Sequence, residues 1–257
     1  MSKPTIVFVH GAWHTPAHFE PLSKVLQSHG YSTRIVALPS VVPTGEAPPE
    51  DIRSDIFAVK EVLDDVLAGG ANALLVPHSY GGIPTTSAVK GLDAQTRSAD
   101  GHESHVVGLA PIAAFIPRQG EALGPCVDLP KGDHGKYPGD DKTCYIPKEK
   151  VHDQMFNGMS EEDSQRWRDK LKSQGRNAMF LLESEYTASK DFPVHWLFCS
   201  NDHACMPDWQ RLNIKKMRED GANVRVEEIN ADHSPYLSAI ERTSDFIRRS
   251  AGESISL

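Results

Sequence analysis

Short apolar runs alternate with amphipathic segments along most of the chain, and this alternation restricts its fold more than any other feature. The runs cover residues 6–9, 35–38, 73–76, 106–116, 194–199 and 224–229. Between two of them, Ile52, Ile56 and Val59 begin an apolar series at intervals of three and four residues, which is typical of one helix face. Strands that alternate with helices form a mostly parallel sheet covered on both faces. We therefore predict an α/β fold with a mostly parallel sheet of about six strands flanked by helices.

The alternation stops between about residues 118 and 191. This stretch contains a Gly-, Asp- and Lys-rich loop at residues 131–142 and continues as charged, helical sequence. We interpret it as a helical lid inserted above the sheet, within a single domain that covers residues 1–257. The acidic side chains of the loop are interpreted as solvated surface rather than as a calcium site.

Residues 74–82 combine an apolar strand with an abrupt turn into a helix, and Ser79 stands at the apex. Such a strained turn holds a serine hydroxyl above the sheet, next to a helix N-terminus, where it can act as a nucleophile. Gly81 fits because a side chain there would crowd the turn, and Gly82 allows the helix to pack closely. Pro77 departs from the usual Gly-x-Ser-x-Gly pattern, so a serine that only caps a helix is the alternative.

A nucleophilic serine needs a histidine base and a carboxylate that orients this base. Asp202 follows the run 194–199 and His233 follows the run 224–229, so we expect both at the carboxyl ends of parallel strands. The chain order Ser, Asp, His is the one that this type of turn requires. Taken singly, Asp202 is more typical of a turn residue and His233 of a solvated side chain or a cap, but the three residues together predict a catalytic triad.

An oxyanion hole needs two backbone N–H donors near the nucleophile. We assign them to Tyr80, directly after the serine, and to Ala12 in the loop that follows the first strand. Gly11, Trp13 and His78 adjoin these positions and are expected to contact the substrate. For Trp13, ordinary packing is the equally weighted alternative.

The segments 8–13, 78–82, 113–117, 202–207 and 233–235 together resemble the α/β-hydrolase superfamily. The resemblance is to the small branch that includes plant methyl esterases, hydroxynitrile lyases and related microbial esterases. It implies a sheet capped by a helical lid, an acyl group bound between them, and no cofactor. It also implies the roles given above to the serine, the histidine, the aspartate and the two amides.

Cyanohydrin-cleaving members of that branch carry a lysine directly after the catalytic histidine and a threonine in the oxyanion loop. Ser234 and Ala12 stand at those two places here. A leaving cyanide would lack its charged partner, so hydrolysis is favoured. We expect a serine esterase or lactonase that acts on a small, largely apolar molecule. Two alternatives stay open: C–C lyase or cyclase chemistry in the same site, and a ligand-sensing protein with this fold.

The formal net charge of −8 comes from 27 Lys and Arg against 35 Asp and Glu, which argues against a nucleic-acid or anionic-membrane partner. No apolar run reaches the length of a membrane span, and the four cysteines are too sparse for a disulfide framework. His10, His14 and His18 lack carboxylates at ligand spacing, so no metal is expected. We expect a cytoplasmic protein whose partner is its small-molecule substrate, and a homodimer is compatible with the sequence.

Overall fold

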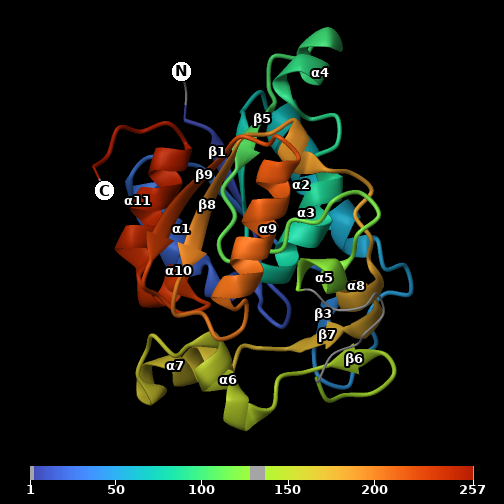
Figure 1. The fold of residues 1–257 in the computed structure, drawn as a ribbon, viewed down its shortest axis with the longest axis vertical. Coiled ribbons are helices and arrows are strands. Elements are labelled where there is room, and N and C mark those ends of the chain that lie inside the picture. Colours follow the sequence, from blue (N-terminus) through green and yellow to red (C-terminus); the bar gives the residue numbers. More distant parts are fainter. Residues whose placement is uncertain (1–2, 128–136, 257) are drawn as a thin grey trace.

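The computed structural model describes residues 3–127 and 137–256. Its centre is a six-stranded sheet in the order β2-β1-β4-β5-β8-β9, in which neighbouring strands are parallel (Figure 1). The strands of this sheet are β1 (Thr5–Val9), β2 (Thr33–Val36), β4 (Ala73–Pro77), β5 (Val106–Leu109), β8 (Val194–Cys199) and β9 (Val224–Ile229). The predicted parallel α/β sheet is confirmed.

Helices cover both faces of the sheet (Figure 1). α1 and α11 pack together on one face, while α2, α3 and α9 lie on the other. The helices outside the lid are α1 (Glu20–Ser28), α2 (Ser54–Ala68), α3 (Gly82–Ala88), α4 (Ala94–Ala99), α9 (Pro207–Glu219), α10 (Pro235–Ser238) and α11 (Ile240–Ser250). Because both faces are covered, β1 and β4 are buried along their whole length, whereas β9 at the edge is buried only in part.

The stretch between about residues 118 and 191 forms a lid over the carboxyl ends of the strands. Its elements are α5 (Leu123–Cys126), β6 (Thr143–Cys144), α6 (Lys148–Met155), α7 (Glu161–Arg168), β7 (Ser173–Gly175) and α8 (Arg176–Leu181), followed by a 3-10 turn, η3 (Ala188–Lys190). Figure 1 shows α6 and α7 together below the ends of β8 and β9. Residues 131–136, in the predicted polar loop, lie outside the described residues.

The lid contains helices, as predicted, and in addition two short strands that the sequence did not reveal. β7 pairs antiparallel with β6 and also with β3 (Val41–Val42), which comes from the proline-bearing loop after β2. Strands of two or three residues are too short to show a period-two pattern in the sequence. The small three-stranded sheet therefore joins the lid to the body of the protein through a contact that periodicity cannot reveal.

β5 is shorter than the predicted run 106–116, because regular pairing ends at Leu109. Pro111 has no N–H, although the ladder toward β8 would need a donor at that position. Ile112 still forms one β-bridge on each side, to His78 and to Leu197. At Ala113 φ is 41° and the backbone turns away from the sheet. The predicted long strand is therefore a short strand followed by a supporting loop.

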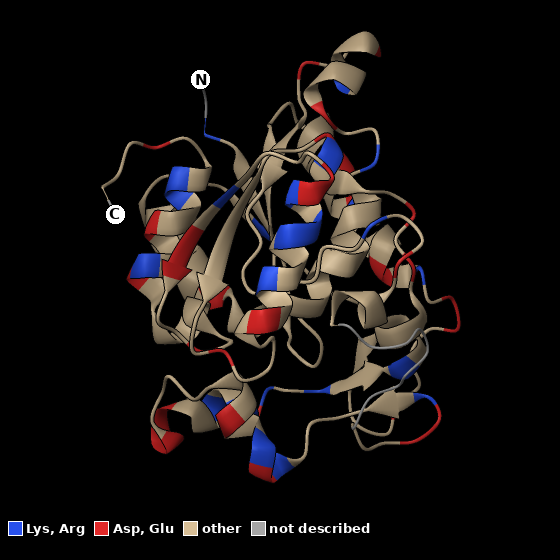
Figure 2. Cartoon of the chain, viewed as in Figure 1, with Lys and Arg blue, Asp and Glu red and all other residues tan. Residues whose placement is uncertain are grey.

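Charged side chains lie on the outer faces of the helices. Figure 2 shows basic and acidic residues interspersed along α9 and α11. Within residues 3–127 and 137–256, no helix has the length and the apolar composition needed to cross a bilayer. The cysteines are buried and free, as expected from their spacing: Cys126, Cys144, Cys199 and Cys205.

Candidate active site

Ser79 lies where β4 ends and a 3-10 turn, η2 (Ser79–Gly81), leads into α3. Its φ of 51° falls in the left-handed region, which a non-glycine residue adopts at a cost of about 1–3 kcal/mol. Two backbone hydrogen bonds hold this conformation. The Ser79 N–H donates to Ile112 O (3.3 Å), and Ser79 O accepts from the Phe115 N–H (3.1 Å). The turn therefore places the serine at the carboxyl edge of the sheet and at the start of a helix.

Two glycines after the serine let the helix pack directly on neighbouring backbone. A Cβ at Gly81 would overlap the carbonyl oxygen of Val9, and a Cβ at Gly82 would overlap that of Phe115. The reason predicted for both glycines is confirmed, because the turn leaves no space for a side chain at either position.

His233 and Asp202 face each other from loops that follow the neighbouring strands β9 and β8. His233 Nδ1 lies 2.7 Å from Asp202 Oδ2, and the two side chains are 2% and 0% exposed. Asp202 Oδ1 accepts the N–H groups of Ala204 and Cys205, each at 2.8 Å. The carboxylate can only accept, so the proton of the shared bond sits on His233 Nδ1 and leaves Nε2 as a base.

Ser79 and His233 line the same narrow cavity, of about 70 Å³, between the sheet and the lid. Within the described residues, no hydrogen bond joins their side chains; such bonds often tighten only when substrate is present. The other lining residues, mostly apolar or aromatic, are Trp13, Tyr80, Phe115, Leu123, Gly124, Val127, Tyr137, Met155, Met179, Phe180, Ala204 and Trp209. None of these side chains carries a formal charge at neutral pH, so the walls favour an uncharged ligand.

The loop after β1 packs closely against Ser79 through Gly11. A Cβ at Gly11 would lie 2.9 Å from Ser79 Cβ, so this close approach requires a glycine. The backbone N–H of Ala12 makes no hydrogen bond within the described part of the chain. The Tyr80 N–H belongs to the first turn of η2, where a helix offers no acceptor of its own. Both predicted donors therefore remain available to a ligand oxygen.

Trp13 lines the cavity and also connects the loop after β1 to the lid. Its φ of 63° turns the backbone sharply. The indole Nε1 donates to Cys144 O in β6 (3.0 Å), and the Trp13 carbonyl accepts the Lys172 N–H just before β7 (2.8 Å). Its ring packs against Tyr137, with the ring centroids 4.8 Å apart. The position of this loop thus depends on lid residues.

His78 does not lie where the sequence predicted. It is fully buried behind the serine and is not part of the cavity wall, because adjacent side chains at the end of a strand point in opposite directions. Its Nε2 donates to His233 O at 2.8 Å. Burial, and secondarily the nearby His233, lowers the pKa of His78 well below its usual value, so the ring is neutral. His78 supports the backbone of the histidine loop instead of contacting substrate.

The histidines near the N-terminus are buried and hydrogen-bonded. His10 Nε2 accepts the Leu38 N–H (3.2 Å), and His18 Nε2 donates to Trp167 O in α7 (3.1 Å). Burial lowers the pKa of His10 and of His18 from 6.5 to about 4. Among residues 3–127 and 137–256, no three His, Cys, Asp or Glu side chains are arranged to hold a metal ion.

A buried carboxylate that the sequence-based prediction missed supports Tyr80. Asp55 on α2 accepts the Tyr80 hydroxyl (2.6 Å), the Ser40 hydroxyl (2.6 Å) and the Ser40 N–H (2.9 Å). Gln174 in β7 donates to Ser40 Oγ (2.8 Å), which extends the network to the lid. Burial raises the pKa of Asp55 above its usual value. An aspartate between the apolar positions of a helix is the signal that would have revealed it.

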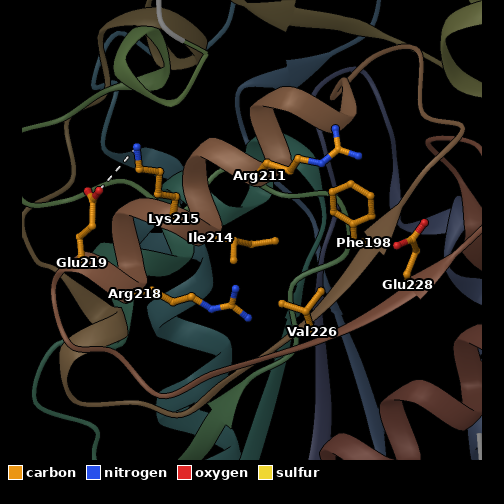
Figure 3. A pocket seen from close by; sticks show the side chains of 8 residues that line it. All are labelled: Phe198, Arg211, Ile214, Lys215, Arg218, Glu219, Val226 and Glu228. Atoms are coloured by element: carbon orange, nitrogen blue, oxygen red, sulfur yellow. Dashed lines mark ion pairs between the residues drawn. The ribbon is translucent and has the colours of Figure 1, made fainter.

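A larger hollow, of about 560 Å³, lies between α9 and β9 (Figure 3). Figure 3 shows Arg211, Lys215 and Arg218 around an apolar floor that includes Ile214 and Val226. Among the described residues, no serine, cysteine or histidine lines this hollow. Its Lys215 and Glu219 side chains are exposed and pair with each other, so the smaller cavity, which Ser79 and His233 line together, is the better candidate for chemistry.

Comparisons with known proteins agree with the observed fold. Residues 6–246 match the sequence profile described as the alpha/beta hydrolase family. The probable hydrolase R7 of a Phoma species is 27% identical over 98% of this chain and 100% of its own length. A pyrethroid hydrolase from Sphingobium faniae JZ-2 has a similar fold, with a TM-score of 0.75, 19% identity, and coverage of 97% of this chain and 98% of that one. Polyneuridine aldehyde esterase is similar with a TM-score of 0.71, 18% identity, and coverage of 97% of this chain and 100% of that one.

Proposed function

The chain belongs to the alpha/beta hydrolase family, and from this we propose that it is a serine hydrolase that cleaves a carboxylic ester or lactone of a small, largely apolar molecule. One observation carries the proposal. Ser79 and His233, from distant parts of the chain, line one cavity, and His233 shares a 2.7 Å hydrogen bond with the buried Asp202. Nucleophilic catalysis by a serine needs these three groups in this relation.

In the proposed cycle, His233 Nε2 takes the hydroxyl proton of Ser79 while its Oγ attacks the substrate carbonyl carbon. The N–H groups of Ala12 and Tyr80 stabilise the oxyanion, and loss of one such donor typically lowers kcat about 10²- to 10³-fold. Collapse of the intermediate expels the alcohol with the proton held on His233, and the acyl group stays on the serine. Water then gives a proton to His233 and attacks the acyl carbon, the acid leaves as the bond to Ser79 Oγ breaks, and His233 returns the proton to Oγ, while Asp202 stabilises the charged imidazole.

The cavity wall supports a neutral substrate, because its aromatic and aliphatic side chains offer no counter-charge. A carboxylate or an ammonium group would lose its hydration without gaining a partner there. Two proteins of similar fold are named a pyrethroid hydrolase and an aldehyde esterase, and these names support the choice of esters as the first class to test.

The experiment is turnover of a panel of neutral esters and lactones by the wild type and by Ser79→Ala. We expect Ser79→Ala to lower kcat about 10⁶-fold while the free energy of unfolding stays within about 1 kcal/mol of the wild type. A fluorophosphonate probe should label Ser79, as peptide mapping would show. Full turnover in Ser79→Ala, or labelling of a different residue, would contradict the mechanism.

Other outcomes of the same experiment would redirect the proposal. Labelling of Ser79 without turnover of any ester or lactone would point to C–C lyase or cyclase chemistry. Slow acylation without release would point to ligand sensing. Cyanide elimination has no structural support, since Ser234 is buried and its hydroxyl pairs with the Tyr236 hydroxyl at 3.1 Å.

A further inference from the structure

One short lid segment contacts both loops that carry the proposed acid and base. The segment consists of residues 153–158, which form the end of α6 and the turn after it, and we call it the clasp. Figure 1 shows α6 directly below the carboxyl ends of β8 and β9.

The clasp contacts the loop that follows β8, which we call the acid loop, at the residues on both sides of the proposed acid Asp202. Asp153 Oδ1 lies 2.8 Å from His203 Nδ1, and Asn157 Nδ2 donates to Asn201 O at 3.0 Å. The two partners are the residues immediately before and after Asp202. Any displacement of the clasp therefore acts on the backbone that fixes the direction of the Asp202 carboxylate.

The clasp also contacts the loop that follows β9 and carries the proposed base His233, which we call the base loop. The Gly158 N–H donates to Asp232 Oδ2 at 3.1 Å, and Asp232 directly precedes His233. The other oxygen of Asp232 accepts the Ser234 N–H (3.1 Å) and the Ser238 hydroxyl (2.6 Å). A Cβ at Gly158 would lie 3.0 Å from Asp232 Cγ, so a larger residue would press on the Asp232 side chain.

The two loops are also bonded to each other and to the sheet without the lid. The Asn201 N–H donates to Ala231 O (3.2 Å), and the Ser200 N–H donates to Ile229 O (3.0 Å). The clasp adds the contacts from the lid. Together the two sets of contacts leave the acid and base side chains almost fully buried.

We propose that the clasp is a positioning element for the acid–base pair. It holds the two loops at the separation that the 2.7 Å hydrogen bond between Asp202 and His233 requires, and it keeps water from that bond. Asn157 and Gly158 are positioning residues, since neither lines the cavity at Ser79. The inference rests on the proposed function for its catalytic meaning, but a hydrogen bond that depends on the lid can be measured without turnover.

The test is the low-field proton NMR resonance of His233 Nδ1, which His233→Ala assigns by its loss. We expect Asn157→Ala to shift the resonance and to broaden it through faster exchange with water. Gly158→Ala should shift and broaden it further, because the added Cβ presses on the Asp232 side chain. Asp153→Asn should give the smallest shift, since this side chain is 67% exposed and its substitution leaves the packing intact.

The matched control is Asp220→Asn. It breaks the 2.7 Å ion pair between Arg118 and Asp220, which also joins the inserted stretch to the body but lies away from both loops. We expect an unchanged resonance in this variant. An unchanged resonance in Asn157→Ala would overturn the proposal, and so would a wild type that shows no such resonance.

The two proposals fail separately. If the wild type is inactive on esters but Asn157→Ala disturbs its resonance, the positioning role of the clasp is supported and the proposed function is contradicted. If the wild type is active and its resonance is the same in Asn157→Ala, the proposed function is supported and the positioning role of the clasp is contradicted.

Discussion

The serine and the acid–base pair reach the same cavity, but the chain holds them in different ways. Ser79 is held by contacts of the backbone. Its N–H and C=O are hydrogen-bonded to the segment after β5, its φ is 51°, and the two glycines that follow it pack on carbonyl groups. Asp202 and His233 stand on loops bridged largely by side chains and by the lid. Backbone contacts tolerate few substitutions, whereas side-chain contacts can be changed one residue at a time.

This difference predicts that the two regions respond differently to substitution. Changes to the residues that support Ser79, as distinct from Ser79 itself, should act mainly on the free energy of unfolding. Changes around the pair should act mainly on kcat. Both quantities, measured in the same variants, therefore test the comparison.

After Ser79→Ala itself, the largest effect is expected at the acid–base pair, from Asp202→Asn. An amide cannot stabilise the charged imidazole, and it favours the wrong tautomer of His233, so kcat should fall about 10⁴-fold. The free energy of unfolding should change far less than this factor implies, because the substituted side chain keeps an oxygen for the two backbone N–H donors. A loss of less than tenfold in kcat would show that the aspartate has no such role.

The next largest effect is expected in the pH dependence of the free energy of unfolding, through His10 and His18 in the segment that follows β1. Burial lowers the pKa of His10 and His18 to about 4, below the value of 6.5 in the unfolded chain. Between these values the unfolded chain binds more protons, so stability present above pH 6.5 is lost as pH falls toward 4. We expect a loss of about 1.4 kcal/mol per pH unit for each histidine, measured by urea unfolding. His18→Asn, which keeps an acceptor near the Nδ1 position, should show a shallower decline, and an equal slope would contradict the assignment.

A smaller loss of stability is expected from Gly82→Ala. The new Cβ would overlap Phe115 O, and such overpacking typically costs about 1–3 kcal/mol of unfolding free energy. The matched control is Gly69→Ala at the end of α2, where φ is −74° and the nearest atom would be 3.4 Å from the Cβ. Equal stability of the two variants would show that the close approach at the serine turn is unimportant.

The smallest effect is expected from Tyr80→Phe. It removes the hydroxyl that donates to Asp55 and leaves the Tyr80 backbone N–H in place. Asp55 Oδ2 keeps the Ser40 hydroxyl as a donor, so the lost hydrogen bond should cost only about 0.5–1.5 kcal/mol of unfolding free energy, with little change in KM. Thermal unfolding and ester turnover in one preparation would test this, and a large rise in KM would place the hydroxyl in contact with substrate instead.

The features that the sequence predicted well are contiguous. Residues 74–82 contain the strand, the turn and both glycines, so local patterns alone predict the geometry at the serine. The sheet was predictable for the same reason, since each strand is one apolar run. The end of β5 depends on Pro111, whose missing N–H was visible in the sequence but was outweighed by the apolar residues around it.

The features that the sequence did not reveal depend on distances between remote segments. Asn157 meets Asn201 from 44 residues away, and Gly158 meets Asp232 from 74 residues away. Neither contact leaves a pattern along the chain, because each depends on where the lid comes to lie. The same is true of His78, whose residue type suggested a contact with substrate while its direction at the strand end excluded one.

Trp13 has a practical consequence for the design of chimeras. Its indole N–H and its carbonyl are hydrogen-bonded to the backbone of Cys144 and Lys172 in the lid. Trp13 directly follows Ala12, so the lid helps to fix the position of the Ala12 N–H. A lid exchanged with that of a relative to alter selectivity would also move one of the proposed oxyanion donors. Grafts that preserve the backbone partners at both positions should keep the catalytic rate, and grafts that lose them should combine a new specificity with slower turnover.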